Sequence, residues 1–147
     1  MSDRNPPGTP DLVSATSGRD PSLVARDLMA AVGEVMLTWG FLEAAMIQAL
    51  GVPARAPIVG RWLAAAGPGW PMGDSIKDAA AVRNLLAHGL CAIEAQPTAG
   101  EEARVFCRDP DNGSVSLPLS RLREVIRNLD AVRREIERAA RAGDGVA

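Results

Sequence analysis

A long amphipathic segment, residues 22–50, decides the fold, and it reads SLVARDLMAAVGEVMLTWGFLEAAMIQAL. Its apolar residues recur in alternating steps of four and three, the spacing that places them on one face of an α-helix. Pro21 comes directly before it, and proline suits a first helical position because the N–H that it lacks would have no partner there. We therefore expect one long helix with a buried stripe. The stripe consists of Leu28, Val32, Val35, Trp39, Leu42, Met46 and Leu50.

A second strip of the same segment carries Gly33 and Gly40, which have no side chain to hold another backbone at a distance. Glu43 falls on this strip, beside the buried stripe rather than opposite it. Its carboxylate is either a solvated flank or a polar group turned into a cleft, where it would take part in substrate binding.

Three further helices follow from start and stop signals. Residues 67–71 form a loop that holds Trp70, which is either a hydrophobic plug at the end of the bundle or an exposed contact. Asp74 or Ser75 is expected to cap the third helix, and Ser120 the fourth. The expected helices cover residues 57–66, 75–88 and 120–142.

Between the third and fourth helices the apolar period changes from helical to strand-like. The sequence Asp-Pro-Asp-Asn-Gly at 109–113 is a strong reversal signal, so a small antiparallel meander is expected over about 90–118. The fold class is therefore mainly α, a bundle of about four helices with a β meander between helices 3 and 4. The expected strands cover residues 90–94, 103–108 and 114–117.

One domain accounts for the chain, since 147 residues can bury about 68–70% of the surface that the unfolded chain exposes. Residues 1–20 are rich in proline, glycine and polar side chains and are expected to be a disordered tail. The helical domain should occupy 21–142, and 143–147 should fray. Cys91 and Cys107 fit no zinc-binding spacing, so they are either free thiols or face each other across neighbouring strands.

Composition excludes several functional classes. A net charge of -2 gives no global attraction for nucleic acid or anionic membranes, so any anion-binding surface must be local. The chain has no phosphate-binding loop, dinucleotide fingerprint or zinc-protease motif, and we expect neither a metal nor a cofactor. No signal-peptide pattern and no uninterrupted membrane-spanning run stand out, so a cytoplasmic location without a membrane partner is expected.

The first turns of the last helix carry Arg121, Arg123 and Arg127, which give that end a positive excess. These arginines are either part of a solvated, ion-paired helix face or a local patch that binds the phosphates of RNA. Both interpretations remain open at this point.

The sequence RNLLAHG at 83–89 holds the chain's only histidine, His88. Histidine before glycine is typical of a helix end, where the imidazole interacts with the helix dipole and Gly89 adopts a left-handed conformation. The alternative is a chemical role together with Arg83. A step of five residues turns about 140° on an ideal helix, so the two side chains converge only if the helix ends before His88.

An arginine, a histidine and an amide are sufficient for RNA cleavage without a metal. Imidazole can take the proton of a 2′-hydroxyl, and histidine is the side chain that titrates by default near neutral pH. Guanidinium stays charged and can stabilise the negative charge that develops at the phosphorus.

The 83–89 sequence resembles the signature of HEPN (higher eukaryotes and prokaryotes nucleotide-binding) domains, an arginine, a polar residue and, after a short spacer, a histidine. Residues 39–43, Trp-Gly-Phe-Leu-Glu, are similar to part of the opening helix of that family, so the resemblance covers about 22–142. Many HEPN proteins are metal-independent endoribonucleases of toxin-antitoxin, phage-defence and CRISPR systems, and they act as dimers. The resemblance implies that His88 is catalytic, Arg83 binds the phosphate, and Asn84 orients one of the two.

The resemblance also implies partners. These are a second copy of the chain, an RNA substrate and an antitoxin or nucleotidyltransferase. One branch of the family is regulated by transfer of AMP to a tyrosine after the histidine, and this chain has no tyrosine, so that regulation cannot apply. Other HEPN domains are not catalytic, and a dimeric interaction or nucleotide-binding module is the alternative function.

Overall fold

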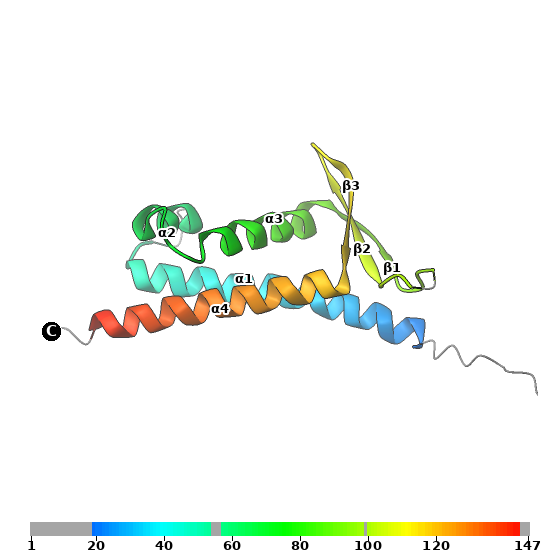
Figure 1. Cartoon of the computed structure of the whole chain (residues 1–147), viewed down its shortest axis with the longest axis horizontal. Coiled ribbons are helices and arrows are strands. Elements are labelled where there is room, and N and C mark those ends of the chain that lie inside the picture. Colours follow the sequence, from blue (N-terminus) through cyan, green and yellow to red (C-terminus); the bar gives the residue numbers. More distant parts are fainter. Residues whose placement is uncertain (1–18, 54–56, 99, 145–147) are drawn as a thin grey trace, which may run out of the picture.

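The computed structural model describes residues 19–53, 57–98 and 100–144, and within them the chain forms α-helices and a small antiparallel sheet (Figure 1). The mainly α fold class is therefore confirmed, and the meander lies between α3 and α4 as expected. The elements are α1 (Pro21–Leu50), α2 (Ile58–Ala66), α3 (Gly73–Gly89), β1 (Leu90–Glu94), β2 (Arg104–Asp109), β3 (Gly113–Pro118) and α4 (Leu119–Asp144).

Local chemistry sets the ends of α1. The side chain of Asp20 accepts a hydrogen bond from the N–H of Ser22 at 3.0 Å, and Pro21 occupies the first helical position. At the other end Gly51 adopts a left-handed conformation, with φ of 61°, and its N–H bonds the carbonyl of Ile47. The predicted start and end of this helix are confirmed.

The helices pack as a layered bundle (Figure 1). α1 and α4 run alongside each other in the same direction, and α3 crosses above them in the opposite direction. The core between them is aliphatic, as expected from a chain so poor in aromatic residues. Its fully buried members include Leu28, Val35, Leu42, Met46, Ile76, Leu122, Val125, Leu129 and Ile136.

The sheet has the order β1-β2-β3, with both pairings antiparallel. Asp109 shapes the β2–β3 reversal, because its carboxylate accepts hydrogen bonds from the Asp111 N–H and the Asn112 side chain, which lower its pKa. Gly113 completes the reversal with φ of 73°. The predicted hairpin is confirmed.

The two cysteines lie near each other without a bond between them. Cys107 pairs with Leu90 in the ladder and is fully buried, and burial raises the pKa of its thiol. Cys91 occupies an irregular step of β1, is exposed and donates to the Phe106 carbonyl at 3.3 Å. Both cysteines are free thiols, as one of the two interpretations expected.

The predicted helix caps are wrong. α3 begins at Gly73 after Met72 with no side-chain cap, so neither Asp74 nor Ser75 caps it. α4 begins at Leu119, before Ser120, and its cap comes from the loop that precedes β2. Ser120 donates from its backbone N–H at 3.0 Å and from its hydroxyl at 2.8 Å to the carboxylate of Glu102, and these hydrogen bonds lower the pKa of Glu102. A carboxylate suits this position because it meets the positive end of the helix dipole.

Trp70 is half-buried and lies edge-on to Trp62 of α2, with 5.8 Å between the ring centroids. This packing agrees with a plug at the α2 end of the bundle rather than an exposed contact. The tail predicted for residues 1–20 lies outside the described residues up to 18, and α4 continues to Asp144, beyond the predicted start of fraying.

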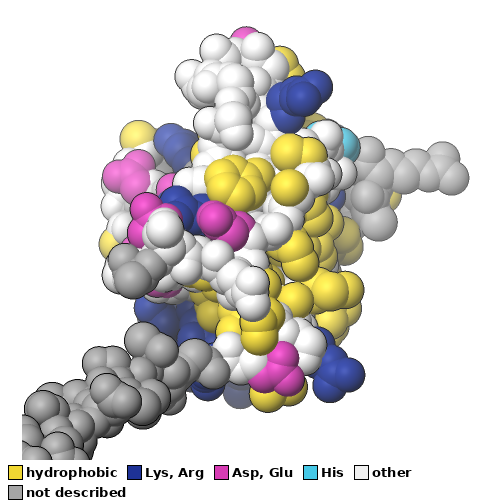
Figure 2. All heavy atoms as spheres, turned by 90° about the vertical axis from the view of Figure 1, so that its right-hand side faces the viewer, with side chains coloured by type: hydrophobic (Ala, Val, Ile, Leu, Met, Phe, Trp, Pro, Cys, Tyr) yellow, Lys and Arg dark blue, Asp and Glu magenta, His cyan; other side chains and the backbone are white. Residues whose placement is uncertain are grey.

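The outer side of α1 is apolar and exposed. Among the described residues α1 is also the helix long and apolar enough to cross a membrane, although no uninterrupted apolar run in the sequence indicated one. The same composition is typical of a core helix in a soluble protein, and a third of the apolar window is buried here. Figure 2 shows that apolar side chains gather over one side of the molecule.

Candidate functional site at the end of helix α3

The helix that carries the candidate site does not end before His88. α3 continues through Gly89, and β1 begins at the next residue. Arg83 and His88 are therefore about 140° apart around one helix axis and do not converge within a chain. The condition for convergence within one chain, a helix end before His88, is therefore not met.

Close packing, rather than a left-handed turn, explains Gly89. Its backbone does not have a positive φ, in contrast to Gly51 and Gly113. A Cβ placed on Gly89 would lie 2.3 Å from the carbonyl oxygen and 3.1 Å from the nitrogen of Arg108 in β2. Glycine is needed here because the end of α3 presses against the backbone of the sheet.

Arg83 lies between α3 and α1. Its guanidinium carbon is 5.9 Å from the ring centroid of Trp39, a residue of the buried stripe of α1. One terminal nitrogen donates to the side-chain oxygen of Asn84 at 3.0 Å. The Nε of Arg83 is buried and has no hydrogen-bond partner among the described residues. The aromatic ring and the amide thus fix the orientation of the guanidinium.

Arg83 differs from the other half-buried arginines in its lack of a carboxylate. In the described part of the chain Arg104 pairs with Glu94 at 3.1 Å, Arg121 with Asp78 at 2.6 Å, and Arg133 with Asp130 at 2.7 Å. Within those same residues no carboxylate lies within 4 Å of Arg83. A half-buried, oriented cation without a counter-charge is a candidate anion site.

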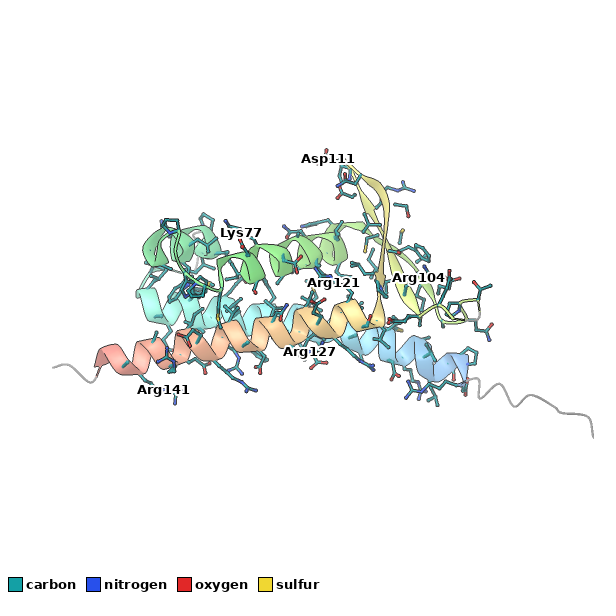
Figure 3. All side chains as sticks on the ribbon, in the orientation of Figure 1. Lys77, Arg104, Asp111, Arg121, Arg127 and Arg141 are labelled. Carbon is teal, nitrogen blue, oxygen red and sulfur yellow. The ribbon has the colours of Figure 1, made fainter. Side chains whose placement is uncertain are left out.

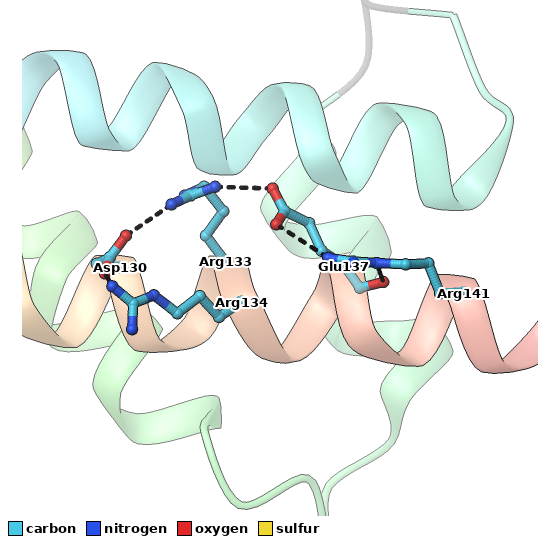
Figure 4. A network of polar contacts seen from close by, with 5 residues as sticks. All are labelled: Asp130, Arg133, Arg134, Glu137 and Arg141. Carbon is cyan, nitrogen blue, oxygen red and sulfur yellow. Dashed lines mark hydrogen bonds and ion pairs between the residues drawn. The ribbon is translucent and has the colours of Figure 1, made fainter.

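The ion pairs on α4 show the contrasting case (Figure 4). Arg133 bridges Asp130 and Glu137, Arg134 contacts Asp130 at 2.5 Å, and Arg141 reaches Glu137. The hydrogen bond from Arg133 is the main cause of the lowered pKa of Asp130. These charges satisfy one another and are not available to a ligand.

Asn84 connects Arg83 to the surface where His88 lies. Asn84 and His88 are four residues apart in α3, so they share one side of the helix. His88 is exposed and makes no hydrogen bond with the described residues. The order around the helix is Arg83, Asn84, His88, and it agrees with a role for Asn84 in orienting Arg83.

Glu43 is half-buried in α1, one turn beyond Trp39. It therefore lies on the side of α1 that holds the ring against Arg83, although it forms no ion pair with a described residue. The carboxylate of Glu43 is therefore neither fully solvated nor fully enclosed, so its burial does not decide between a solvated flank and a polar group turned into a cleft.

The three arginines at the start of α4 do not form one patch. Arg121 lies between α3 and α4 and is held by Asp78 and Glu124, and the hydrogen bond to Asp78 raises its pKa (Figure 3). Arg123 is two residues further, about 160° around the helix from Arg121. Arg123 and Arg127 are exposed, and Arg127 lies on the side of α4 away from α3. Arg121 is already paired with two carboxylates, so only Arg123 and Arg127 of the predicted phosphate patch remain as candidates.

Three hollows in the described part of the chain lie away from the candidate site. A hollow of about 740 Å³ is lined by the C-terminal parts of α1 and α4 and by α2, and others of about 640 and 390 Å³ lie near Glu102 and Trp70. None of these three is lined by Arg83, Asn84 or His88. Within the described residues there is also no cluster of three His, Cys, Asp or Glu side chains that could hold a metal ion.

Trp39 is a part of this site that the sequence did not indicate. The apolar period of residues 22–50 places Trp39 in the buried stripe, and this prediction is confirmed, since Trp39 is 6% exposed. Its contact with Arg83 joins two helices far apart in the sequence, and no local pattern signals such a pair.

Comparison with known proteins adds no identification at this point. No family model, no curated protein and no solved structure matches the chain. The functional proposal therefore rests on the geometry around Arg83.

Proposed function

We propose that this protein is a HEPN-type, metal-independent endoribonuclease that acts as a homodimer in the cytoplasm. In this proposal the four-helix arrangement is that of a HEPN domain. His88 is the catalytic base, Arg83 binds the scissile phosphate, and Asn84 orients Arg83.

The observation that carries the proposal is the state of Arg83. Its guanidinium is held by Trp39 and Asn84, yet no described carboxylate neutralises it. A phosphate is a fitting counter-ion, because the planar guanidinium can offer it two parallel hydrogen bonds.

The reaction needs only side chains of the protein and a water molecule. The imidazole of His88 takes the proton of a ribose 2′-hydroxyl, and the 2′-oxygen attacks the adjacent phosphorus. A bond forms between the 2′-oxygen and phosphorus, and the bond to the 5′-oxygen breaks. The leaving oxygen takes a proton from water, and the product ends are a 2′,3′-cyclic phosphate and a 5′-hydroxyl. Arg83 stabilises the charge on the phosphorus centre during the attack.

The reacting pair must come from two chains. The continuous α3 separates Arg83 and His88 of one chain by about 140° around the helix. In the proposed dimer Arg83 of one copy works with His88 of the other. A symmetric dimer then contains two such pairs.

Incubation with a mixed RNA pool in EDTA tests the activity. Wild-type protein is expected to cut RNA and leave cyclic phosphate ends, whereas His88→Ala should not. Arg61→Ala is the matched control, because Arg61 is exposed on α2, outside the proposed site and the predicted phosphate patch. If wild type cuts no better than His88→Ala, the enzymatic proposal fails.

A toxin or defence role would follow from the same activity. Expression of wild type should then slow cell growth, and His88→Ala should relieve the effect. An antitoxin or nucleotidyltransferase remains a proposed partner of this role.

A non-catalytic interaction module is the second candidate, and the unbroken α3 favours it. Here Arg83 serves to join α3 to Trp39, and His88 is a surface residue near the helix end. A lower melting temperature of Arg83→Ala with no RNA cleavage by wild type would favour this candidate.

A further inference from the structure

The proposed nuclease acts as a dimer, but the proposed reaction does not specify the surface through which two copies pack. The outer face of α1 offers one, and we define it by the side chains that point away from the core. Met29 is 64%, Leu37 63% and Phe41 60% exposed. Small residues complete the outer face of α1, which consists of Met29, Ala30, Gly33, Leu37, Phe41 and Ala44.

The exposed large side chains favour an apolar partner. From Met29 to Ala44 the face is about 22 Å long, and Glu34 is the exposed charge at its margin. Water contact with three large apolar side chains is unfavourable, and their burial against another apolar surface is stabilising. A nucleic acid or another charged partner gains nothing from such a face.

The small residues allow a helix to approach closely. A Cβ added to Gly33 would meet no described residue within 4 Å, so packing within the described part of the chain does not require this glycine. Glycine in a helix costs about 0.5–1 kcal/mol relative to alanine. The space above Gly33 is open to a side chain from outside the molecule.

The outer face of α1 is self-complementary in shape, because its large and small residues are placed symmetrically about Leu37. Gly33 lies four residues before Leu37, and Phe41 lies four residues after it. If two copies of α1 pack antiparallel about a two-fold axis at Leu37, the partner's Phe41 fills the space above Gly33. Ala30 then faces the partner's Ala44, where two small residues let the backbones come close.

The charges favour the same arrangement. In the antiparallel register Glu34 lies opposite the partner's Gly40, and no like charges meet. In a parallel pair Glu34 would lie opposite its own copy, which is unfavourable. Leu90 and Ile93 of the edge strand β1 are also exposed, at 43% and 44%.

We propose that a second copy of this chain packs on the outer face of α1, antiparallel and centred on Leu37. The inference goes beyond the proposed reaction, because it follows from the surface alone and holds whether or not the protein cuts RNA.

Sedimentation velocity over a range of concentrations tests the surface. Wild type is expected to dimerise. Phe41→Asp and Gly33→Leu should each raise the dissociation constant of the dimer by roughly tenfold or more. Phe41→Asp removes the protruding side chain, and Gly33→Leu fills the space that the partner's Phe41 would occupy. Leu23→Asp is the matched control, since Leu23 is 52% exposed on the same helix but about 21 Å from Leu37. Thermal unfolding of each variant checks that it folds.

Cross-linking tests the register. In a Cys91→Ser background, Leu37→Cys should form a disulfide between two chains, because a residue on the axis lies next to its own copy. Leu23→Cys in the same background should not. RNA cleavage is not measured in this experiment, so failure of this proposal is distinguishable from failure of the nuclease.

Three results would overturn the proposal. One is a wild-type monomer at all concentrations, and another is a dimer that Phe41→Asp leaves intact. The third is equal cross-linking at positions 37 and 23. Flotation of a monomeric wild type with neutral phosphatidylcholine vesicles would identify a bilayer, rather than a second copy, as the occupant of the face.

Discussion

At the scale of single residues, Gly89 shows how packing can restrict one position. Among the described glycines it is the one at which a Cβ would come within 3 Å of another backbone. The contact joins the end of α3 to Arg108 of β2, and so it fixes where His88 lies relative to the sheet.

Gly89→Ala should destabilise the fold by about 1–3 kcal/mol, because the methyl group overlaps a backbone that cannot easily move. Gly60→Ala in α2 is the control, since no described residue lies within 4 Å of its added Cβ, and it should be neutral or stabilising by up to about 1 kcal/mol. Urea unfolding measures both. Equal stability of the two variants would contradict the steric account.

Arg83→Lys tests the role of the guanidinium. The lysine keeps the charge but loses the planar fork that contacts Trp39 and Asn84. RNA cleavage is expected to fall roughly tenfold or more, which corresponds to about 1.4 kcal/mol or more of transition-state stabilisation. Arg61→Lys on α2 should cleave like wild type, and a normal rate for Arg83→Lys would argue against phosphate binding by Arg83.

At the scale of elements, Glu102 joins the loop before β2 to the first turn of α4. Its folded-state pKa lies below the ordinary value of 4.5, because Ser120 donates two hydrogen bonds to the carboxylate. A lowered pKa means that the stabilisation is present above 4.5 and is lost as the pH falls through the lowered value.

Glu102→Gln should therefore lower the melting temperature at pH 7, since it removes a charge from the helix N-terminus. The difference from wild type should shrink as the pH falls from 4.5 through the lowered pKa of Glu102, because the carboxylate of the folded wild type becomes protonated there. Thermal unfolding from pH 7 to pH 3 measures this difference. A gap that stays constant over this range would exclude the carboxylate as the cause.

The buried stripe of α1 carries much of the packing between α1 and its neighbours. Leu28→Ala should cost about 2–5 kcal/mol, because Leu28 is fully buried and the change leaves a cavity. Leu23→Ala on the same helix is the control, and it should change stability by less than about 0.5 kcal/mol since Leu23 is 52% exposed. Denaturant titration compares the two.

Local patterns predicted the elements well where the causes are local. Pro21 begins α1, and the Asp-Pro-Asp-Asn-Gly turn joins β2 to β3, both as expected. The cap of α4 could not be predicted, because Glu102 and Ser120 are separated by 18 residues. The conformation of Gly89 could not be predicted either, because a contact with the backbone of β2, rather than a left-handed helix end, requires glycine there.

The same distinction holds for the candidate site. The 83–89 sequence drew attention to Arg83, Asn84 and His88, and the contact between Arg83 and Asn84 is local. The position of Trp39 beneath Arg83 and the engagement of Arg121 by Asp78 depend on how helices pack, which periodicity does not specify.

At the scale of the whole molecule, one chain presents an incomplete site and an uncovered apolar face. Among the described residues Arg83 lacks a counter-charge, His88 is directed elsewhere, and the outer face of α1 lacks a partner. We propose that a second copy of the chain supplies His88 to Arg83, and, as a separate proposal, that a second copy covers the outer face of α1.

The most direct test of the shared site mixes two inactive variants. Arg83→Ala and His88→Ala are combined, dissociated and allowed to reassociate, and RNA cleavage is measured in EDTA. Half of the random dimers are mixed, and each mixed dimer holds one complete pair made by two chains. A site shared between chains predicts about one quarter of wild-type activity for the mixture, since half of the dimers then carry one of two sites. A mixture as inactive as either variant alone would contradict such a site.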